Sequence, residues 1–193
     1  LTYATRGLEP YRGFPEFVQA SAKLLKENKS WHIAIAGNDT INYHRSPKAP
    51  ENGYGGQAYK FYKKNNLIDR VHFLGPLSLL SYRDLLRRSN LHCYFTRPYV
   101  LSWSFLESMF TGCRLFASQT SPVLEFAKDD PDTMLVDYVK SNLGELLVNH
   151  AASIESQGFT PNNIVSEYRK ELIHKLSAKM CVEKHLKLVN SIS

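Results

Sequence analysis

Short apolar runs alternate with amphipathic stretches along most of this chain of 193 residues. The runs are "WHIAIAG" (31–37), "RVHFLG" (70–75), "LHCYFT" (91–96) and "RLFAS" (114–118), and each is short enough to be one buried strand. The stretches between them, such as 14–28 and 78–89, carry apolar residues at helical spacing. Strands that alternate with helices in this way predict βαβ units and therefore an α/β fold around a parallel sheet.

The same reasoning extends to the rest of the chain. Strands are also predicted at 1–5 and 133–138, and helices at 57–65, 102–112, 121–129 and 141–155, with two C-terminal helices within about 162–192. On the helix at 78–89 we expect Leu80, Leu85 and Leu86 to point inward. Residues 38–56 are rich in Gly, Pro and Asn, which is typical of a loop. We interpret residues 1–193 as one Rossmann-like domain, a parallel sheet flanked by helices.

Composition excludes several classes of protein. Apolar residues make up 43% of the chain and charged residues 22%, as in ordinary globular domains. No apolar run reaches the length of a membrane span, and the N-terminus lacks the pattern of a signal peptide. The chain does not begin with Met, so we expect a piece of a longer protein or a processed one. The cysteines Cys93, Cys113 and Cys181 are far apart and odd in number, which favours reduced structural thiols and a cytoplasmic location, with a membrane-peripheral one as the alternative for the full-length protein.

The net charge of +6 suits an anionic partner such as a phosphate or a nucleotide. In a parallel sheet, ligands bind beyond the carboxyl ends of the strands, and Arg6, Arg12 and Arg97 follow predicted strands. An arginine fork grips phosphate oxygens well, although each arginine could instead be a solvated surface charge. The one basic and aromatic cluster, at 59–66, is interpreted as an amphipathic helix rather than a nucleic-acid surface. We interpret His92 as a core histidine.

Several sequence blocks, in order, resemble the C-terminal, donor-binding domain of family 4 retaining glycosyltransferases, which have the two-domain GT-B fold. The family opens this domain with G-R-x-x-x-x-x-K-G, and here "TRGLEPYRG" offers Arg6, Arg12 and Gly13. The family's strands that end in glycine resemble "IAIAG" and "VHFLG", and its L-E-A-M-x-x-G block resembles "LESMFTGCRLFAS". Nearly the whole chain takes part in the resemblance.

The resemblance implies a function and a set of site residues. A nucleotide-diphospho-sugar would donate a hexose or related sugar to an acceptor hydroxyl, with Arg6 and Arg12 stabilising the leaving diphosphate as catalytic residues. The nucleotide would be bound by Gly75, Pro76, Glu107 and Ser108, with the Glu107 carboxylate on the ribose hydroxyls. Tyr99, Ser121 and Glu125 would lie near the donor sugar and phosphates. No metal and no cofactor beyond the nucleotide sugar is implied, and the chain has no Asp-x-Asp motif. The acceptor, a glycan, lipid or protein, would be held by an N-terminal domain outside this chain, so the chain alone should turn over little.

The sequence also departs from the family pattern. Tyr99 stands eight residues before Glu107, where the family has the first glutamate of an E-x7-E pair, and Ser121 and Pro122 replace a glycine pair. Two alternatives therefore stay open: a degenerate, non-catalytic nucleotide-sugar-binding module and a GT-B sugar-nucleotide epimerase. Glu107 could also be a structural acid, either in an ion pair or interacting with the helix macrodipole.

Overall fold

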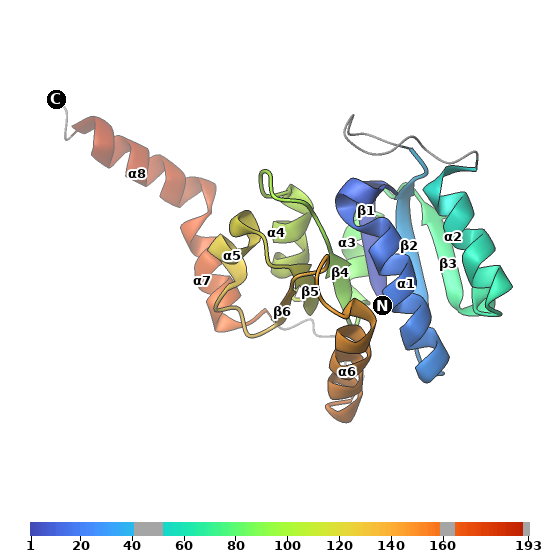
Figure 1. Cartoon of the computed structure of the whole chain (residues 1–193). Helices are drawn as coiled ribbons and strands as arrows, with labels where there is room; N and C mark the ends of the chain where they lie inside the picture. Colours follow the sequence, from blue (N-terminus) through green and yellow to red (C-terminus); the bar gives the residue numbers. More distant parts are fainter. Residues whose placement is uncertain (41–51, 159–164, 191–193) are drawn as a thin grey trace.

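The computed structural model describes residues 1–40, 52–158 and 165–190. Strands and helices alternate through the described chain (Figure 1). In order they are β1 (Thr2–Gly7), the 3-10 helix η1 (Pro10–Arg12), α1 (Phe14–Glu27), β2 (Ile33–Asn38), α2 (Gly53–Lys64), the 3-10 helix η2 (Ile68–Arg70), β3 (Val71–Gly75), α3 (Leu79–Arg87), β4 (His92–Tyr94), α4 (Trp103–Phe110), β5 (Leu115–Ser118), α5 (Ser121–Ala127), β6 (Thr133–Val136), α6 (Leu143–Ser156), α7 (Glu167–Lys175) and α8 (Ala178–Asn190).

The six strands form one sheet in the order β3-β2-β1-β4-β5-β6, and every neighbouring pair is parallel. This is the α/β, Rossmann-like architecture that the sequence predicts, and that prediction is confirmed. The chain moves outward from β1 to β3 and then returns to pair β4 with the other side of β1. The sheet therefore has a topological switch point between β1 and β4, where a crevice opens at the carboxyl ends of the strands.

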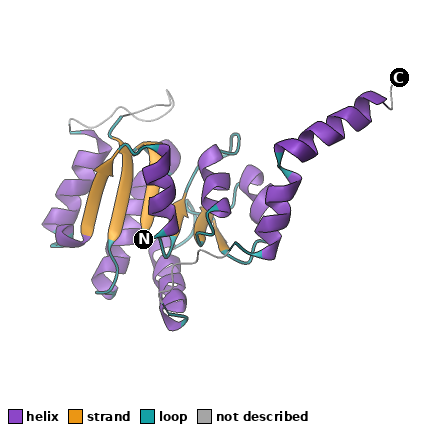
Figure 2. Ribbon diagram, turned by 180° about the vertical axis from the view of Figure 1, so that it is seen from behind, coloured by secondary structure: helices purple, strands orange, loops and turns teal. Residues whose placement is uncertain are grey.

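Helices cover both faces of the sheet, as Figure 2 shows from behind. Alternation along the strands assigns side chains to the two faces. In β5, Phe116 packs into the cluster that includes α1 and α6, whereas Leu115 and Ala117 pack into the cluster of α4 and α5. All three side chains are fully buried, which explains why this strand is apolar without a break.

Several element boundaries differ from those predicted. Helix α2 begins at Gly53, so "GYGG" is helical rather than part of the loop, because the Asp39 carboxylate accepts hydrogen bonds from the amides of Gly55 (2.8 Å) and Gly56 (3.0 Å). Strand β4 is shorter than 91–96. Leu86 is buried as expected, but the prediction for Leu80 is wrong, since it is 63% exposed on the outer side of α3. The rest of the predicted loop, 41–51, lies outside the described residues.

The predicted C-terminal helices correspond to α7 and α8. Helix α7 packs beside α4, and α8 projects away from the sheet (Figure 1). Among the described residues, no helix combines the length and the apolar character that crossing a membrane would require.

Candidate functional site

A cavity of about 480 Å³ lies at the switch point of the sheet. Its walls come from the carboxyl ends of β1, β2 and β4, from the segment after β3, and from the start of α4. The lining residues are Ala4, Thr5, Arg6, Arg12, Ala36, Gly37, Asn38, Pro76, Leu77, Leu79, Tyr82, Tyr94, Ser102 and Ser104. The crevice expected from the sheet topology is therefore a real cavity, and it is lined by basic and hydroxyl groups.

An irregularity in β1 presents Arg6 to this cavity. Strand β1 pairs with β2 at Ala4↔Ala36 and again at Gly7↔Asn38, so two residues of β1, Thr5 and Arg6, face one residue of β2, Gly37. An extra residue of this kind bends a strand and re-aims its side chains, and such bulges are common next to functional sites. The Arg6 side chain is exposed at the cavity wall.

Arg12 reaches the same cavity from the 3-10 helix η1. The Tyr3 hydroxyl donates to the Arg12 carbonyl (2.8 Å), and Arg12 Nη1 donates to Thr96 Oγ1 (3.1 Å), so both ends of the residue are held. The structure thus brings together two of the three arginines that follow predicted strands, whereas Arg97 does not line this cavity. Two guanidinium groups on one cavity give it a positive potential suited to an anion.

Hydroxyl groups from α3, β4 and the start of α4 form another part of the cavity wall. Ser102 Oγ and Ser104 Oγ are hydrogen-bonded to each other at 2.8 Å, and the Tyr82 hydroxyl donates to the Ser104 carbonyl (3.3 Å). Burial raises the pKa of Tyr94, and the opposing effect of Arg12 is smaller. Burial also raises the pKa of Tyr82. Both phenols therefore stay protonated, so this side of the cavity carries neutral groups that can donate hydrogen bonds.

Helix α4 carries Glu107 and Ser108 but shows only its first turn to the cavity. Ser108 is fully buried, and its hydroxyl donates to the Ser104 carbonyl (2.6 Å), which fixes the helix internally. Glu107 is half-buried beside Tyr82, whose pKa it helps to raise. Neither residue lines the cavity, and within the described chain no ion pair to Glu107 is found.

A second hollow of about 360 Å³ adjoins the first beside β2, β3 and α2. Gly75 lines it, and Pro76 lines both hollows together with Gly37 and Asn38. Asp39 also lies in this wall, where its carboxylate occupies the N-terminus of α2. The end of this helix therefore already holds an anion from the protein itself.

The three residues predicted near the donor sugar lie outside both hollows. Tyr99 is 69% exposed in the segment between β4 and α4, and Ser121 and Glu125 are exposed on α5. All three nevertheless belong to segments that follow β4 or β5 at the carboxyl edge of the sheet.

The remaining titratable candidates are structural. His92 is fully buried, its Nδ1 is 2.9 Å from Thr2 Oγ1, and burial lowers its pKa to about 3, so the prediction of a core histidine is confirmed. Cys93 and Cys113 are buried free thiols, and burial raises the pKa of Cys113 to about 12, whereas the free Cys181 is exposed. In the segments 1–40, 52–158 and 165–190, no three His, Cys, Asp or Glu side chains gather as a metal site would need.

Sequence reasoning places Thr5 and Asn38 at the ends of predicted strands, where ligands bind, but assigns them no role. It missed four further polar residues of the cavity wall: Tyr82, Tyr94, Ser102 and Ser104. Tyr82 lies inside a predicted helix and Tyr94 inside a predicted strand, so no local signal distinguishes either from a core aromatic.

The fold is similar to that of several solved structures. HepE from Anabaena, in complex with UDP, has a TM-score of 0.75 and 16% identity over 98% of this chain and 48% of its own. A glycosyltransferase from Rickettsia africae has a TM-score of 0.73 and 16% identity over 99% and 47% of the two chains. The C-terminal domain of LpcC, a group 1 family glycosyl transferase from Francisella tularensis, has a TM-score of 0.68 and 15% identity over 91% and 84%.

No protein-family model matches the chain, and no curated protein matches it by sequence. The chain spans about half the length of HepE and of the Rickettsia enzyme. At this level of identity the likeness shows the fold: the sheet and its helices match the C-terminal half of a GT-B glycosyltransferase, as the sequence predicts.

Proposed function

We propose that this chain is the donor-binding half of a retaining, family 4 glycosyltransferase and that it binds a nucleotide-diphospho-sugar at the switch-point cavity. The observation that carries the proposal is the cavity itself, which Arg6 and Arg12 line together with the hydroxyl groups of Ser102, Ser104 and Tyr94. The fold it shares with HepE, whose structure contains UDP, supports a nucleotide as the ligand.

In this proposal Arg6 and Arg12 stabilise the diphosphate as negative charge accumulates on it during departure of the sugar. Preorganised cations at a site of developing charge lower the barrier because they need no reorganisation in the transition state. Arg12 is held at its backbone and at its guanidinium, which meets that condition. The first turn of α4, which borders the same cavity, would supply backbone amides, since its N-cap Ser102 makes no side-chain hydrogen bond to them.

The proposed nucleotide contacts follow from the two adjoining hollows. Gly75 and Pro76 border the part of the site beside β3, where a base would fit. Glu107 lines neither hollow, and the proposal that it accepts ribose hydroxyl hydrogen bonds rests on the family resemblance and on its place beside Tyr82 of the cavity wall. Ser108, being buried, would act by fixing α4 rather than by touching the ligand. No metal or further cofactor belongs to the proposal. The acceptor would be a glycan, lipid or protein bound by a separate domain, and the protein would act in the cytoplasm.

A non-catalytic nucleotide-sugar-binding module is the second candidate. It is favoured by Tyr99, which stands where the family has a glutamate and which lies exposed outside the cavity. Both candidates bind the donor, and they differ only in whether the sugar is transferred.

Calorimetry with UDP, UMP and uridine tests donor binding. The proposal predicts that UDP binds more tightly than UMP, since two phosphates engage both arginines, and that added Mg²⁺ does not change the order. Equal affinities for UDP and UMP, or no binding of either UDP or GDP, would contradict a diphosphate site. Release of UDP from UDP-glucose by a longer protein containing this chain, but not by its Arg12→Ala variant, would separate the enzyme from the binding module.

A further inference from the structure

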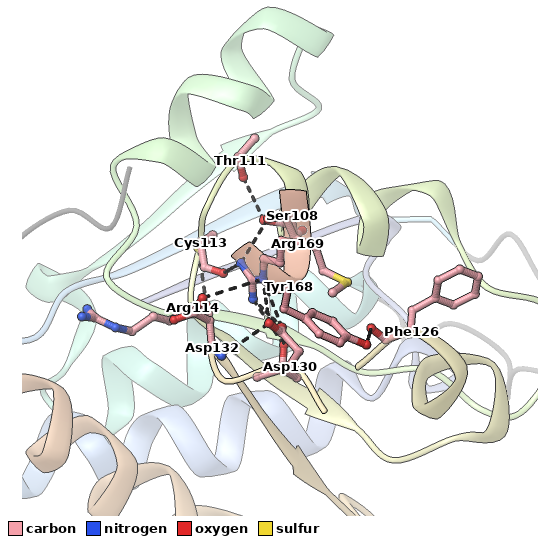
Figure 3. Close-up of polar contacts among 11 residues, drawn as sticks. Ser108, Thr111, Cys113, Arg114, Phe126, Asp130, Asp132, Tyr168 and Arg169 are labelled. Atoms are coloured by element: carbon pink, nitrogen blue, oxygen red, sulfur yellow. Dashed lines mark hydrogen bonds and ion pairs between the residues drawn. The ribbon is translucent and has the colours of Figure 1, made fainter. Parts of the chain in front are cut away.

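A fully buried arginine fastens α7 to the helix that borders the cavity. The Arg169 side chain is 0% exposed, and its partner Asp130 is buried in the loop before β6 (Figure 3). Arg169 Nε donates to Asp130 Oδ1 (3.0 Å), and Nη2 donates to Asp130 Oδ2 (2.7 Å). This is a two-pronged, charge-assisted contact, the strongest type of side-chain hydrogen bonding.

The guanidinium also donates to backbone carbonyls at the C-terminal end of α4 and just after it. Arg169 Nη1 donates to the carbonyls of Met109 (3.1 Å) and Cys113 (2.7 Å), and Nη2 also reaches Thr133 Oγ1 (3.3 Å). Met109 lies in the last turn of α4, and Cys113 lies in the turn between α4 and β5. The cation thus neutralises the carbonyl end of α4, where the helix dipole is negative.

The opposite end of α4 forms part of the cavity wall. Ser102 and Ser104 line the cavity at this end, and Glu107 lies between the two ends. The helix has eight residues, so its ends are only about 12 Å apart. A rigid rod this short transmits a displacement of its C-terminal end to its N-terminal end with little loss.

We propose that Arg169 is a positioning residue for the cavity: clamped to Asp130, it fixes the carbonyl end of α4 and thereby places the Ser102–Ser104 turn and Glu107. The inference rests on the function proposed above. A buried ion pair is poor at adding stability, since well-packed apolar residues often replace one without loss, so a geometric role accounts better for its presence here. Binding sites respond steeply to displacements of about 1 Å, which is the precision that such a clamp provides.

The test separates placement from stability by comparing a single and a double variant. Arg169→Met leaves the Asp130 carboxylate buried without its cation, so we expect a large fall in melting temperature. Combining it with Asp130→Leu removes both fully buried charges and fills the space, so we expect most of the melting temperature to return. The Asp132 carboxylate, 4.0 Å from Arg169 Nε, stays in place but is partly exposed and can be solvated. The double variant still lacks the donors to the Met109 and Cys113 carbonyls, so α4 stays unclamped.

A matched control comes from Arg70, which donates to carbonyls at the end of α1, away from the cavity. Its Nη1 donates to the Asn28 carbonyl (2.7 Å), and its Nη2 contacts the Leu25 carbonyl. Arg70→Met should lower the melting temperature and leave UDP affinity unchanged.

UDP affinity and hydrogen exchange then decide the inference. We expect the double variant to bind UDP about threefold to thirtyfold more weakly than wild type, with faster exchange confined to the amides of α4. Wild-type affinity together with wild-type exchange in the refolded double variant would overturn the inference. If the wild-type chain binds no nucleoside diphosphate, the proposed function fails, and the exchange of α4 amides then decides by itself whether Arg169 holds this helix.

Discussion

Replacing Gly37 by alanine should damage the floor of the cavity in a predictable way. Gly37 faces the irregular residues of β1, and its φ of +143° belongs to a region that side chains rarely adopt. A Cβ atom at this position would lie 2.3 Å from the carbonyl oxygen of Thr5. That oxygen belongs to the backbone of the neighbouring strand, so the clash cannot be relieved by a side-chain rotation.

Gly75 allows the two penalties to be measured separately. It also has a positive φ, +66°, but an added Cβ would meet nothing within 4 Å. Gly75→Ala should therefore cost only the conformational term, about 1 to 2 kcal/mol. Gly37→Ala adds an overpacking term of about 1 to 3 kcal/mol to a backbone strain of similar size, so we expect a loss of about 2 to 6 kcal/mol.

Urea denaturation followed by circular dichroism measures both losses, with the m-value as a check that unfolding stays two-state. Calorimetry with UDP on the folded variants should show a weaker complex for Gly37→Ala, because β1 must move away from β2 beside Arg6. If Gly37→Ala lowers the free energy of unfolding no more than Gly75→Ala does, the clash with the Thr5 carbonyl adds no measurable destabilisation and the reasoning is wrong.

Three further predictions concern the cavity and the core. Arg12→Ala should weaken UDP binding by about 1.5 to 3 kcal/mol, the range for hydrogen bonds to charged groups, and calorimetry showing unchanged affinity would place the anion elsewhere. Glu107→Gln should leave the melting temperature nearly unchanged, since the described residues offer no ion pair to break. It should weaken the binding of UDP more than that of 2′-deoxy-UDP, with a coupling of about 1 kcal/mol between mutation and missing hydroxyl when both ligands are measured on both proteins. Additive losses of affinity would argue against a ribose contact. The pKa of His92 falls from 6.5 to about 3 on folding, so the unfolded protein binds the proton first as the pH is lowered. The contribution of neutral His92 to the free energy of unfolding should be fully present above pH 6.5 and fall by about 1.4 kcal/mol per pH unit between 6.5 and 3. His92→Asn should flatten this part of the pH profile measured by urea denaturation, and an unchanged slope would assign it to other groups.

The sheet was predictable because its strands are parallel and mostly buried on both faces. Such strands are continuous apolar runs, so Ile33, Ile35 and Leu115 reveal their strands without an alignment. The carboxyl ends of these strands then fix the position of the cavity, since a parallel sheet brings all of those ends to one edge. This is why Arg6 and Arg12 could be grouped from the sequence before any contact between their segments was known.

The clamp at Arg169 could not be predicted in the same way. It lies in "YRKELIHK", where a basic residue among other charges suggests a solvated helix face, and its partner Asp130 is 39 residues away in a short acidic turn. The burial of Arg169 depends on how α7 packs on α4, which is a tertiary property. The Leu80 prediction fails for a different reason: Leu80 lies six residues before Leu86, about 120° away around the helix, so a helix that buries Leu86 leaves Leu80 exposed.

The helix ends around the cavity differ in a way that orients the proposed ligand. At α2 the Asp39 carboxylate already accepts from the amides of Gly55 and Gly56, and at α3 the Ser78 hydroxyl accepts from the Ser81 amide. At α4 the N-cap Ser102 makes no such bond, and this end lines the same cavity as Arg12. An anion gains from open amides and from cations and is repelled by a carboxylate. We therefore propose that the diphosphate of the donor binds beside the N-terminal end of α4 and the two arginines. In this proposal the charge of Asp39 disfavours the diphosphate in the hollow beside β3, which leaves that hollow to the uncharged part of the nucleotide.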